Sequence, residues 1–523
     1  MMNCYSIKRL QHRAQRVAVA LLVSAGILSS APSASAASLQ AAQGLFRRGD
    51  YLGAARASYD VMNSSSGDTR VNAEFWLAQA LKGAGLPYAA SFFYGRVVSK
   101  GSRSTLFRPA LESLSDINAR IPLGRANIAG LFRSKLDPLS VPPSAQGFYF
   151  YYRGLETFEN NPTRKTNLIR AKSDFDRVPG SSPYYSLAQF YLGIIYSTLK
   201  NPESSASAFK RAQSRAGSQG IRELSTMNLA RANYELKSYR NAFEQYSKIP
   251  RDSDLWLQSL LEGAWAFFVI QKHNNTLGNI HTLHSPFFKD RFYPESYILQ
   301  AITYLRLCRY ESAKDSLKSF GKNYKNKFVD LNKLLKTYNR QYAGFYDVIA
   351  KYKNTKRVQD FSEAAEIADS VSRSDAFKEG QQVVRALDRE RSTLRSRSGR
   401  LGEGMVTVLR KALEDLRLAT AERTGQQGFD LAVQLFRYLQ DLSNQVRLIN
   451  IELLSGQTDA LRSEYQGESF GSDSSEWGEG MKELDLKRQL EFWPFEQEYW
   501  EDELGAYVYN IDSKCGGSKK KGR

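Results

Sequence analysis

Pairs made of a small residue and, four positions later, a large apolar one recur along the first three fifths of the chain. The pairs are Ala55 and Tyr59, Ala90 and Tyr94, Ala171 and Phe175, Ser205 and Phe209, Ala242 and Tyr246, and Ala313 and Leu317. Their large members lie 35, 81, 34, 37 and 71 residues apart, so every step but the second is close to one or two multiples of a period in the mid-thirties. Residues i and i+4 share one face of a helix, where the small residue admits a neighbouring helix and the large one fills the gap beside it. The pattern predicts an array of helical hairpins.

A first helix precedes the pair in each of the clearer copies. In the clearest copy, Leu192, Gly193 and Tyr196 lie on the first helix, Asn201-Pro202 makes a turn, and Ser205, Phe209 and Ala212 lie on the second helix. A hairpin of this length cannot bury both of its faces alone. We therefore expect the hairpins to stack and to leave a long inner surface for partners.

The residues of this copy resemble the tetratricopeptide repeat family. The resemblance rests on the period, on Leu192-Gly193-x-x-Tyr196 with Phe209 and Ala212 after it, and on Gly49-Asp50-Tyr51 beside a turn. It covers residues 38–322, with departures at 101–146 and 271–294. It implies an all-α protein with a right-handed superhelix of paired helices, here over 37–350, whose concave groove takes peptides or partner helices. Tyr196 and Tyr234 are our candidates for residues that line this groove.

Longer helices are predicted between residues 355 and 465. Apolar residues at steps of three and four, which are typical of a coiled coil, form two runs: Val406, Leu409, Leu413 and Leu416, then Ala432, Leu435, Leu439, Leu442, Val446, Ile449 and Leu453. Gly425-Gln426-Gln427-Gly428 between the runs predicts a turn. We expect an antiparallel coiled-coil hairpin, with completion of the seam by a second chain as the alternative.

Positive charge is in excess over the chain as a whole. The formal net charge is +19, and +15 remains after the four basic residues of the first 36 are removed. This balance favours anionic neighbours such as acidic proteins, lipid headgroups or cell-wall polymer, with plain solubility as the other explanation. Arg385 and Arg389 begin a basic segment, 385–400, that is either a solvated helical face or a contact for an acidic surface.

The end of the chain, 466–523, has a different composition. Glycine, serine and acidic residues from 466 to 480 are typical of a linker, and an acidic segment rich in aromatic rings follows. Trp493 and Trp500 are candidate docking residues, because rigid amphipathic rings contribute much of the energy of protein interfaces. Self-docking of this tail onto the basic body is the alternative. The tail is also similar to the C-terminal aromatic segments of periplasmic repeat proteins from gliding and envelope-spanning machines.

The first 36 residues have the features of a cleaved signal peptide. A basic leader precedes the apolar run 17–28, and Ala34-Ser35-Ala36 matches the small-x-small cleavage pattern. We therefore expect a periplasmic protein that does not span the membrane, and nucleic acid is not an expected partner. Cys308 and Cys515 remain after processing, and the sequence does not decide whether they pair.

Residue patterns for catalysis, metal binding or a cofactor are weak. His281 and His284 stand three apart without a completing cluster of ligands, and the glycines of 399–404 predict a helix break rather than a phosphate loop. Glu468-Ser469 matches the catalytic pair of lytic transglycosylases, but only 55 residues follow Glu468, too few to form a cleft. The resulting hypothesis is a non-enzymatic scaffold for cell-envelope proteins, with a binder of cell wall or another anionic polymer as the alternative.

Overall fold

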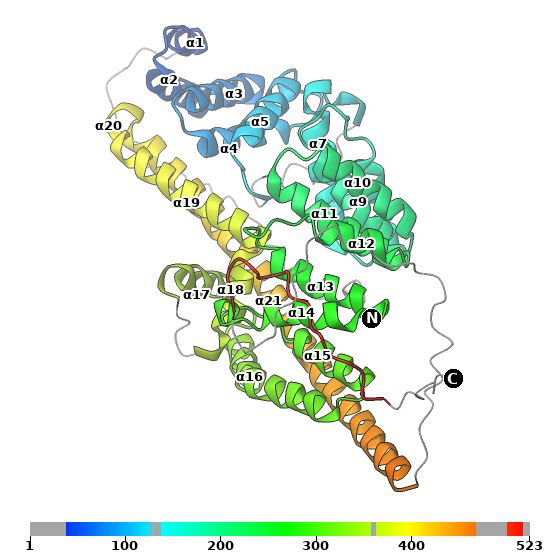
Figure 1. Ribbon diagram of the computed structural model, residues 1–523. Coiled ribbons are helices and arrows are strands. Elements are labelled where there is room, and N and C mark those ends of the chain that lie inside the picture. Colours follow the sequence, from blue (N-terminus) through cyan, green and yellow to red (C-terminus); the bar gives the residue numbers. More distant parts are fainter. Residues whose placement is uncertain (1–37, 126–127, 129–137, 357–361, 467–498, 516–523) are drawn as a thin grey trace. The chain divides into compact units, whose positions relative to one another are not determined.

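The computed structural model describes residues 38–125, 128, 138–356, 362–466 and 499–515 (Figure 1). All regular elements within these ranges are helices, so the predicted all-α class is confirmed. The signal peptide prediction and Trp493 lie outside the described residues. None of the described helices is both long enough and apolar enough to cross a bilayer.

Consecutive helices pair as hairpins along most of the chain. The pairs are α1 (Leu39–Arg47) with α2 (Tyr51–Ser64), α3 (Gly67–Gly83) with α4 (Pro87–Val98), α7 (Pro143–Asn160) with α8 (Lys165–Phe175), α9 (Tyr185–Thr198) with α10 (Pro202–Ser214), α11 (Gln219–Glu235) with α12 (Tyr239–Tyr246), α13 (Trp256–Val269) with α14 (His273–Leu283), and α15 (Glu295–Arg306) with α16 (Tyr310–Thr337). Helix α5 (Phe107–Arg120) lies between the second and third pairs. The hairpin predicted at 192–212 is confirmed.

The turns inside six of these seven hairpins share one backbone conformation, and the turn between α7 and α8 is the exception. A residue with φ between 52° and 81° ends the first helix at Gly49, Gly85, Lys200, Lys237, Gln271 and Cys308. In every case the next residue donates its N–H to the carbonyl five residues back, at 2.9–3.0 Å. This is the Schellman motif, which satisfies carbonyls that the helix end leaves without partners. The six positions lie 36, 115, 37, 34 and 37 residues apart, so the backbone itself repeats with the period seen in the side chains.

The small and large pairs do the packing expected of them. All their members are buried except Tyr59, which is half-buried. Between α9 and α10, a Cβ added to Gly193 would lie 2.5 Å from the ring of Phe209, and the Ser205 hydroxyl donates to the carbonyl of Gly193 at 2.9 Å. Small residues are therefore needed where the two helices touch.

Two compact units divide the chain, and each combines part of the hairpin array with later helices. Unit 1 comprises residues 1–188 and 382–420, and unit 2 comprises 189–381 and 421–523. Unit 2 also contains α17 (Tyr342–Thr355) and α18 (Ala365–Arg373). The boundaries fall inside α9, α19 (Asp375–Ser396) and α21 (Glu403–Gln466).

The turn predicted at Gly425-Gln426-Gln427-Gly428 is wrong, because α21 continues through it as one helix of 64 residues. A Cβ on Gly425 would overlap the carbonyl oxygen of Tyr342, and one on Gly428 would lie 2.9 Å from the side chain of Val371. These glycines therefore allow close packing of helices and do not end one.

The hairpin of long helices has its turn further upstream. Helix α19 ends at Ser396, the short α20 (Ser398–Leu401) follows, and Gly402 has a left-handed φ of 85° before α21 begins. Ion pairs of 2.6 Å from Arg391 to Glu414 and 2.8 Å from Asp388 to Arg417 join α19 to the first part of α21 in antiparallel order. The helix break predicted at 399–404 is confirmed.

Candidate binding surfaces

Within unit 1, α19 and α20 run along the turns of the first hairpins. The contacts, in order along the array, are Arg400 to Asp50, Arg397 to the carbonyl of Ala84, Glu390 to the amides of Tyr88 and Ala89, and Val383 to Gly124. Helix α19 thus meets one hairpin turn of the array for about every two helical turns of its own length. That match is geometric, because two helical turns rise about 11 Å and packed helices lie about 8–10 Å apart.

Glu390 is the buried carboxylate of this row. Its carboxylate accepts the N–H of Tyr88 at 3.0 Å and that of Ala89 at 2.7 Å, so it caps the N-terminus of α4. Burial raises the pKa of Glu390 to about 7, although the two backbone hydrogen bonds act in the opposite direction. The contact is therefore sensitive to pH in the neutral range.

Arg385 and Arg389 are exposed, and they lie about 140° and 100° around α19 from Glu390, counting 100° per residue. The Arg389 side chain donates to the carbonyl of Arg385 at 3.4 Å, and neither guanidinium forms an ion pair with a described carboxylate. Other members of the basic segment have structural roles instead, since Arg391 pairs with Glu414 and Arg397 holds Ala84. The predicted basic segment therefore has one set of arginines that contacts the rest of unit 1 and another that faces solvent.

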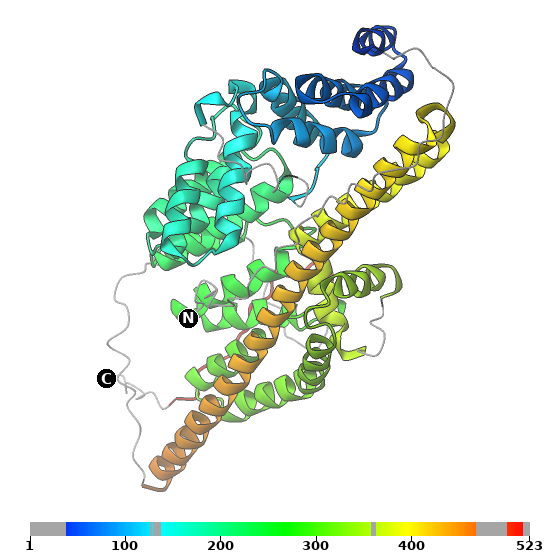
Figure 2. The same cartoon turned by 180° about the vertical axis from the view of Figure 1, so that it is seen from behind.

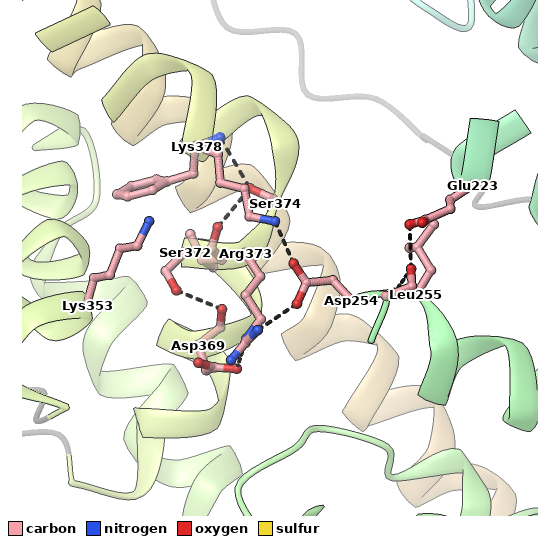
Figure 3. Close-up of polar contacts among 12 residues, drawn as sticks. Glu223, Asp254, Leu255, Lys353, Asp369, Ser372, Arg373, Ser374 and Lys378 are labelled. Atoms are coloured by element: carbon pink, nitrogen blue, oxygen red, sulfur yellow. Dashed lines mark hydrogen bonds and ion pairs between the residues drawn. The ribbon is translucent and has the colours of Figure 1, made fainter. Parts of the chain in front are cut away.

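A polar junction in unit 2 joins the loop before α13 to α18 and the start of α19 (Figure 3). Asp254 accepts hydrogen bonds from Arg373 at 2.6 Å and Lys378 at 2.7 Å. Arg373 also contacts Asp369 at 2.6 Å, and Arg291 reaches the same carboxylate at 3.1 Å. Burial alone would raise the pKa of Asp254, but the bonds from Lys378 and Arg373 outweigh it and lower that pKa. The junction is a closed network of paired charges, which suits a structural role.

Tyr234, a predicted groove residue, packs against the core of unit 2. Its ring meets that of Tyr239 edge-on at 5.1 Å, and it contacts a buried cluster that includes Tyr246 and Leu261. Burial, followed by the negative charges of Tyr239 and Glu295, raises the pKa of Tyr234 to about 12. Truncation of this side chain therefore perturbs the fold as well as any groove.

Tyr196, the other predicted groove residue, lies in the last turn of α9 and is half-buried. Its carbonyl accepts the N–H of Asn201 at 2.9 Å, which makes it part of the repeating turn. Tyr196 and Tyr234 precede the left-handed residues Lys200 and Lys237 by four and three positions, respectively. They therefore occupy different positions in their repeats.

A buried carboxylate links the two hairpins that follow Tyr196. Glu262 of α13 is 1% exposed and receives two hydrogen bonds from Arg231 of α11, at 2.7 and 2.9 Å. The Tyr246 hydroxyl and the Gln258 amide donate to it at 3.0 and 2.8 Å. Every oxygen of this carboxylate is hydrogen-bonded, which stabilises its charge and leaves no lone-pair site for a substrate.

Helix α21 lies against α15, α16 and α17 within unit 2 (Figure 2). The Tyr438 hydroxyl donates to Glu295 of α15, Phe436 stacks on Phe328 of α16 at 4.6 Å, and Phe429 meets Phe345 of α17 at 5.6 Å. Leu439 and Leu442 of the predicted heptads are buried by these contacts. This part of the apolar seam is therefore completed within the chain.

Residues 499–515, which we call the C-terminal strap, lie across α13 and α14. Leu504 and Tyr507 join the hydrophobic core of unit 2, and Tyr499 stacks on His281 with ring centroids 4.4 Å apart. A Cβ on Gly278 would overlap the carbonyl oxygen of Tyr507, so the strap rests directly on the backbone of α14. Self-docking, the alternative given for this tail, is what these residues do.

Main-chain hydrogen bonds and one disulfide hold the strap in place. Gly505 donates to Thr282 at 2.9 Å, Tyr509 to the carbonyl of Asn274 at 3.0 Å, and Lys514 to that of Leu307 at 2.8 Å. The strap ends at the disulfide between Cys308 and Cys515, so the pairing that the sequence left open is formed. Trp500, a predicted docking residue, remains 51% exposed at the start of the strap.

Attraction between the acidic tail and the basic body would favour self-docking, but the arginines that contact the strap bind its backbone carbonyls. Arg251 and Arg309 donate to the carbonyls of Asp502 and Asp512, at 2.8 and 3.1 Å, and not to their carboxylates. The strap is therefore held chiefly by hydrogen bonds of its backbone and by the two buried side chains of Leu504 and Tyr507.

His281 and His284 do not converge on a common point. The Nδ1 atom of His281 lies 3.2 Å from the Tyr509 hydroxyl, whereas Nε2 of His284 lies 2.8 Å from that of Ser296. Burial, followed by the charge of His281, lowers the pKa of His284 to about 3. Within the described ranges no group of three metal-ligating side chains is present, and Glu468-Ser469 lies outside those ranges.

Comparison with known proteins adds no relative. No family model matches the chain, and no curated protein matches it.

Two structural features of these surfaces escaped sequence reasoning. The brace formed by α19 had a signal, since Val383, Glu390 and Arg397 are seven residues apart, but arginines dominate that segment and concealed it. The polar junction around Asp254 had none, because its members come from three separate parts of the chain.

Proposed function

We propose that this chain is a periplasmic scaffold that binds other proteins of the cell envelope. The observation that carries the proposal is the hairpin array, whose turns repeat one left-handed residue and one hydrogen bond across six hairpins. Stacked hairpins bury their shared faces and present a long exposed inner surface, which is suited to partners more than to chemistry.

The proposed compartment has separate support. The disulfide between Cys308 and Cys515 favours an oxidising environment, and residues 1–36 have the sequence pattern of an export signal. An oxidising compartment reached by export in a bacterium is the periplasm.

We place the partner surface on unit 1. Helices α3, α5 and α7 there are linked by polar contacts between residues 34 positions apart, Lys82 to Asp116 at 2.5 Å and Asn118 to Tyr152 at 2.9 Å. These contacts leave a partly exposed polar face, and Arg120 beside it is 75% exposed. In unit 2, by contrast, the chain's own α21 and C-terminal strap already cover parts of the array.

Arg385 and Arg389 provide a second face of unit 1, suited to an acidic partner. Both are exposed, and the charge of Arg389 also acts on Tyr88. Reversal of these charges removes attraction to a carboxylate-rich surface.

The test is cross-linking of the purified protein to envelope proteins, followed by binding measurements with each purified partner. We expect reproducible partners for the unchanged chain and weaker binding of acidic ones by Arg385→Glu with Arg389→Glu. The matched control is Lys100→Glu with Lys411→Glu, which changes the charge equally at other exposed positions of unit 1. Failure to cross-link any protein above the level of an unrelated exported protein would contradict the scaffold.

A further inference from the structure

Helix α16 carries a basic stripe, and four of its six lysines form no ion pair with a described carboxylate. Its exposed lysines all fall within about 100° of arc on one side of the helix, counting 100° per residue. They are Lys314, Lys318, Lys322, Lys325, Lys333 and Lys336. We call this set the α16 lysine stripe; at 1.5 Å per residue it extends over roughly 33 Å.

The apolar residues of α16 lie on the opposite side. Ala313, Leu317, Phe320, Tyr324 and Leu331 are buried and bind the helix to the rest of unit 2. The helix is therefore anchored by one face and presents the other to solvent.

Lys327 shows what a structural lysine looks like on the same helix. It lies on the buried side, forms an ion pair with Glu366 of α18, and sits 4.9 Å from the centre of the Tyr324 ring. The stripe lysines differ from it in direction, in exposure and in their lack of such partners.

Few carboxylates neutralise the stripe. Asp315 pairs with Lys318 at 3.1 Å and Asp330 with Lys333 at 3.5 Å. Among the described residues no carboxylate pairs with Lys314, Lys322, Lys325 or Lys336. The surrounding segment 310–356 contains eleven lysines and arginines against four carboxylates, which concentrates a large part of the chain's positive charge here.

We propose that the α16 lysine stripe binds a linear anionic polymer. The stripe is long, narrow and one helix wide, which matches an extended chain of phosphates or carboxylates. Lysines act as point charges on flexible stems and bind such groups without fixed geometry. This proposal does not rest on the scaffold function and concerns unit 2 alone.

A membrane surface fits this helix less well. A helix that binds the bilayer interface lays its apolar face into the lipid, but that face of α16 is buried inside the protein. Along the stripe the exposed large apolar side chain is Val329, at 46%, and no aromatic residue accompanies it.

The experiment measures binding of the full chain to long-chain polyphosphate and to polyglutamate at low ionic strength. The test variant changes Lys314, Lys322, Lys325 and Lys336 to glutamine, which keeps the helix propensity. The control changes Lys210, Lys248, Lys272 and Lys289, four exposed lysines elsewhere in unit 2, in the same way. Helix content is compared by circular dichroism, so that a folding defect is detected.

We expect the test variant to bind about tenfold or more weakly than the unchanged chain and the control to change by about twofold or less. Added salt should weaken polymer binding by the unchanged chain more than binding by the test variant, because salt screens exposed charges. Equal losses in both variants would show that net charge alone matters and would overturn the proposal. Binding to neither polymer, or only to vesicles that contain phosphatidylglycerol, would overturn it as well.

Discussion

Replacement of Gly278 by alanine should lift the C-terminal strap from α14. The added Cβ would overlap the carbonyl oxygen of Tyr507, which belongs to the backbone and cannot turn aside. Alanine is the better helix former, so propensity alone predicts a gain of about 1 kcal/mol in the free energy of unfolding. The clash lowers the free energy of unfolding and the helix propensity raises it, so the sign of the measured change shows whether the strap rests on α14.

The size of the loss follows from what the strap buries. Leu504 is 5% exposed and Tyr507 is 7% exposed, and full burial of such a side chain contributes about 1.5–3 kcal/mol. If both leave the core, the cost is about 3–6 kcal/mol, and the helix-propensity gain reduces it to about 2–5 kcal/mol. The remaining strap bonds to Asn274 and Thr282 would be exchanged for bonds to water at small net cost.

The measurement is urea unfolding of the full chain with its disulfide intact, together with the rate at which chymotrypsin cleaves the strap. The control is Gly321→Ala on α16, where an added Cβ meets nothing within 4 Å. That change should raise stability by up to about 1 kcal/mol and leave strap cleavage unchanged. If Gly278→Ala behaves like Gly321→Ala in both assays, the strap does not rest on α14 as described.

Three further outcomes are expected. Gly425→Ala should lower stability by about 1–3 kcal/mol in urea unfolding, because its Cβ would meet the Tyr342 carbonyl in a continuous helix; a gain would point to open space at this position. Glu390 has a raised pKa of about 7 against 4.5 when unfolded, so its contribution is fully present below pH 4.5 and is lost as pH rises through 7. Unfolding at pH 5 and pH 8 should therefore show a decline of about 3 kcal/mol that Glu390→Gln removes, and equal declines in both proteins would contradict this assignment. Cys515→Ser should lower the free energy of unfolding, by up to about 5 kcal/mol in the chain-entropy account, while Tyr507 keeps the strap docked; rapid strap cleavage in the variant would show that the disulfide alone holds it.

The hairpin array was accessible from sequence because its signals are local. A small residue four positions before a large one constrains how two neighbouring helices touch, and both members of the pair lie in one element. Ser205 and Phe209 illustrate this, since both contact Gly193 on the other side of a single turn. The repeating left-handed residue was less visible, because lysine, glutamine and cysteine occupy that position as well as glycine.

Gly425 and Gly428 show why the later helices were divided wrongly. A glycine that ends a helix and one that lets another backbone approach a helix have the same sequence signal. What separates them is the presence of Tyr342 and Val371 at those positions, residues that are 50 or more positions away along the chain. Members of the predicted heptads on both sides, such as Leu413 and Leu439, are buried, but how they face their neighbours across the glycines depends on tertiary packing.

The exposure of the predicted binding residues could be foreseen for some of them and not for others, for the same reason. Exposure of Arg385 and Arg389 follows from their helical spacing, whereas the half-burial of Tyr234 depends on neighbours in other hairpins. An aromatic side chain that would line a groove and one that fills a core have identical local patterns.

The sequence by itself determined the all-α class, the period of the hairpins and the break between the long helices, because each depends on spacing within one or two adjacent elements. Only the tertiary structure decided that α21 is unbroken, that Cys308 pairs with Cys515, and that the strap docks on its own chain. Each of those features joins segments far apart in sequence, where the favourable contact energy must exceed the entropy lost on ordering the chain between them. No local pattern records that balance.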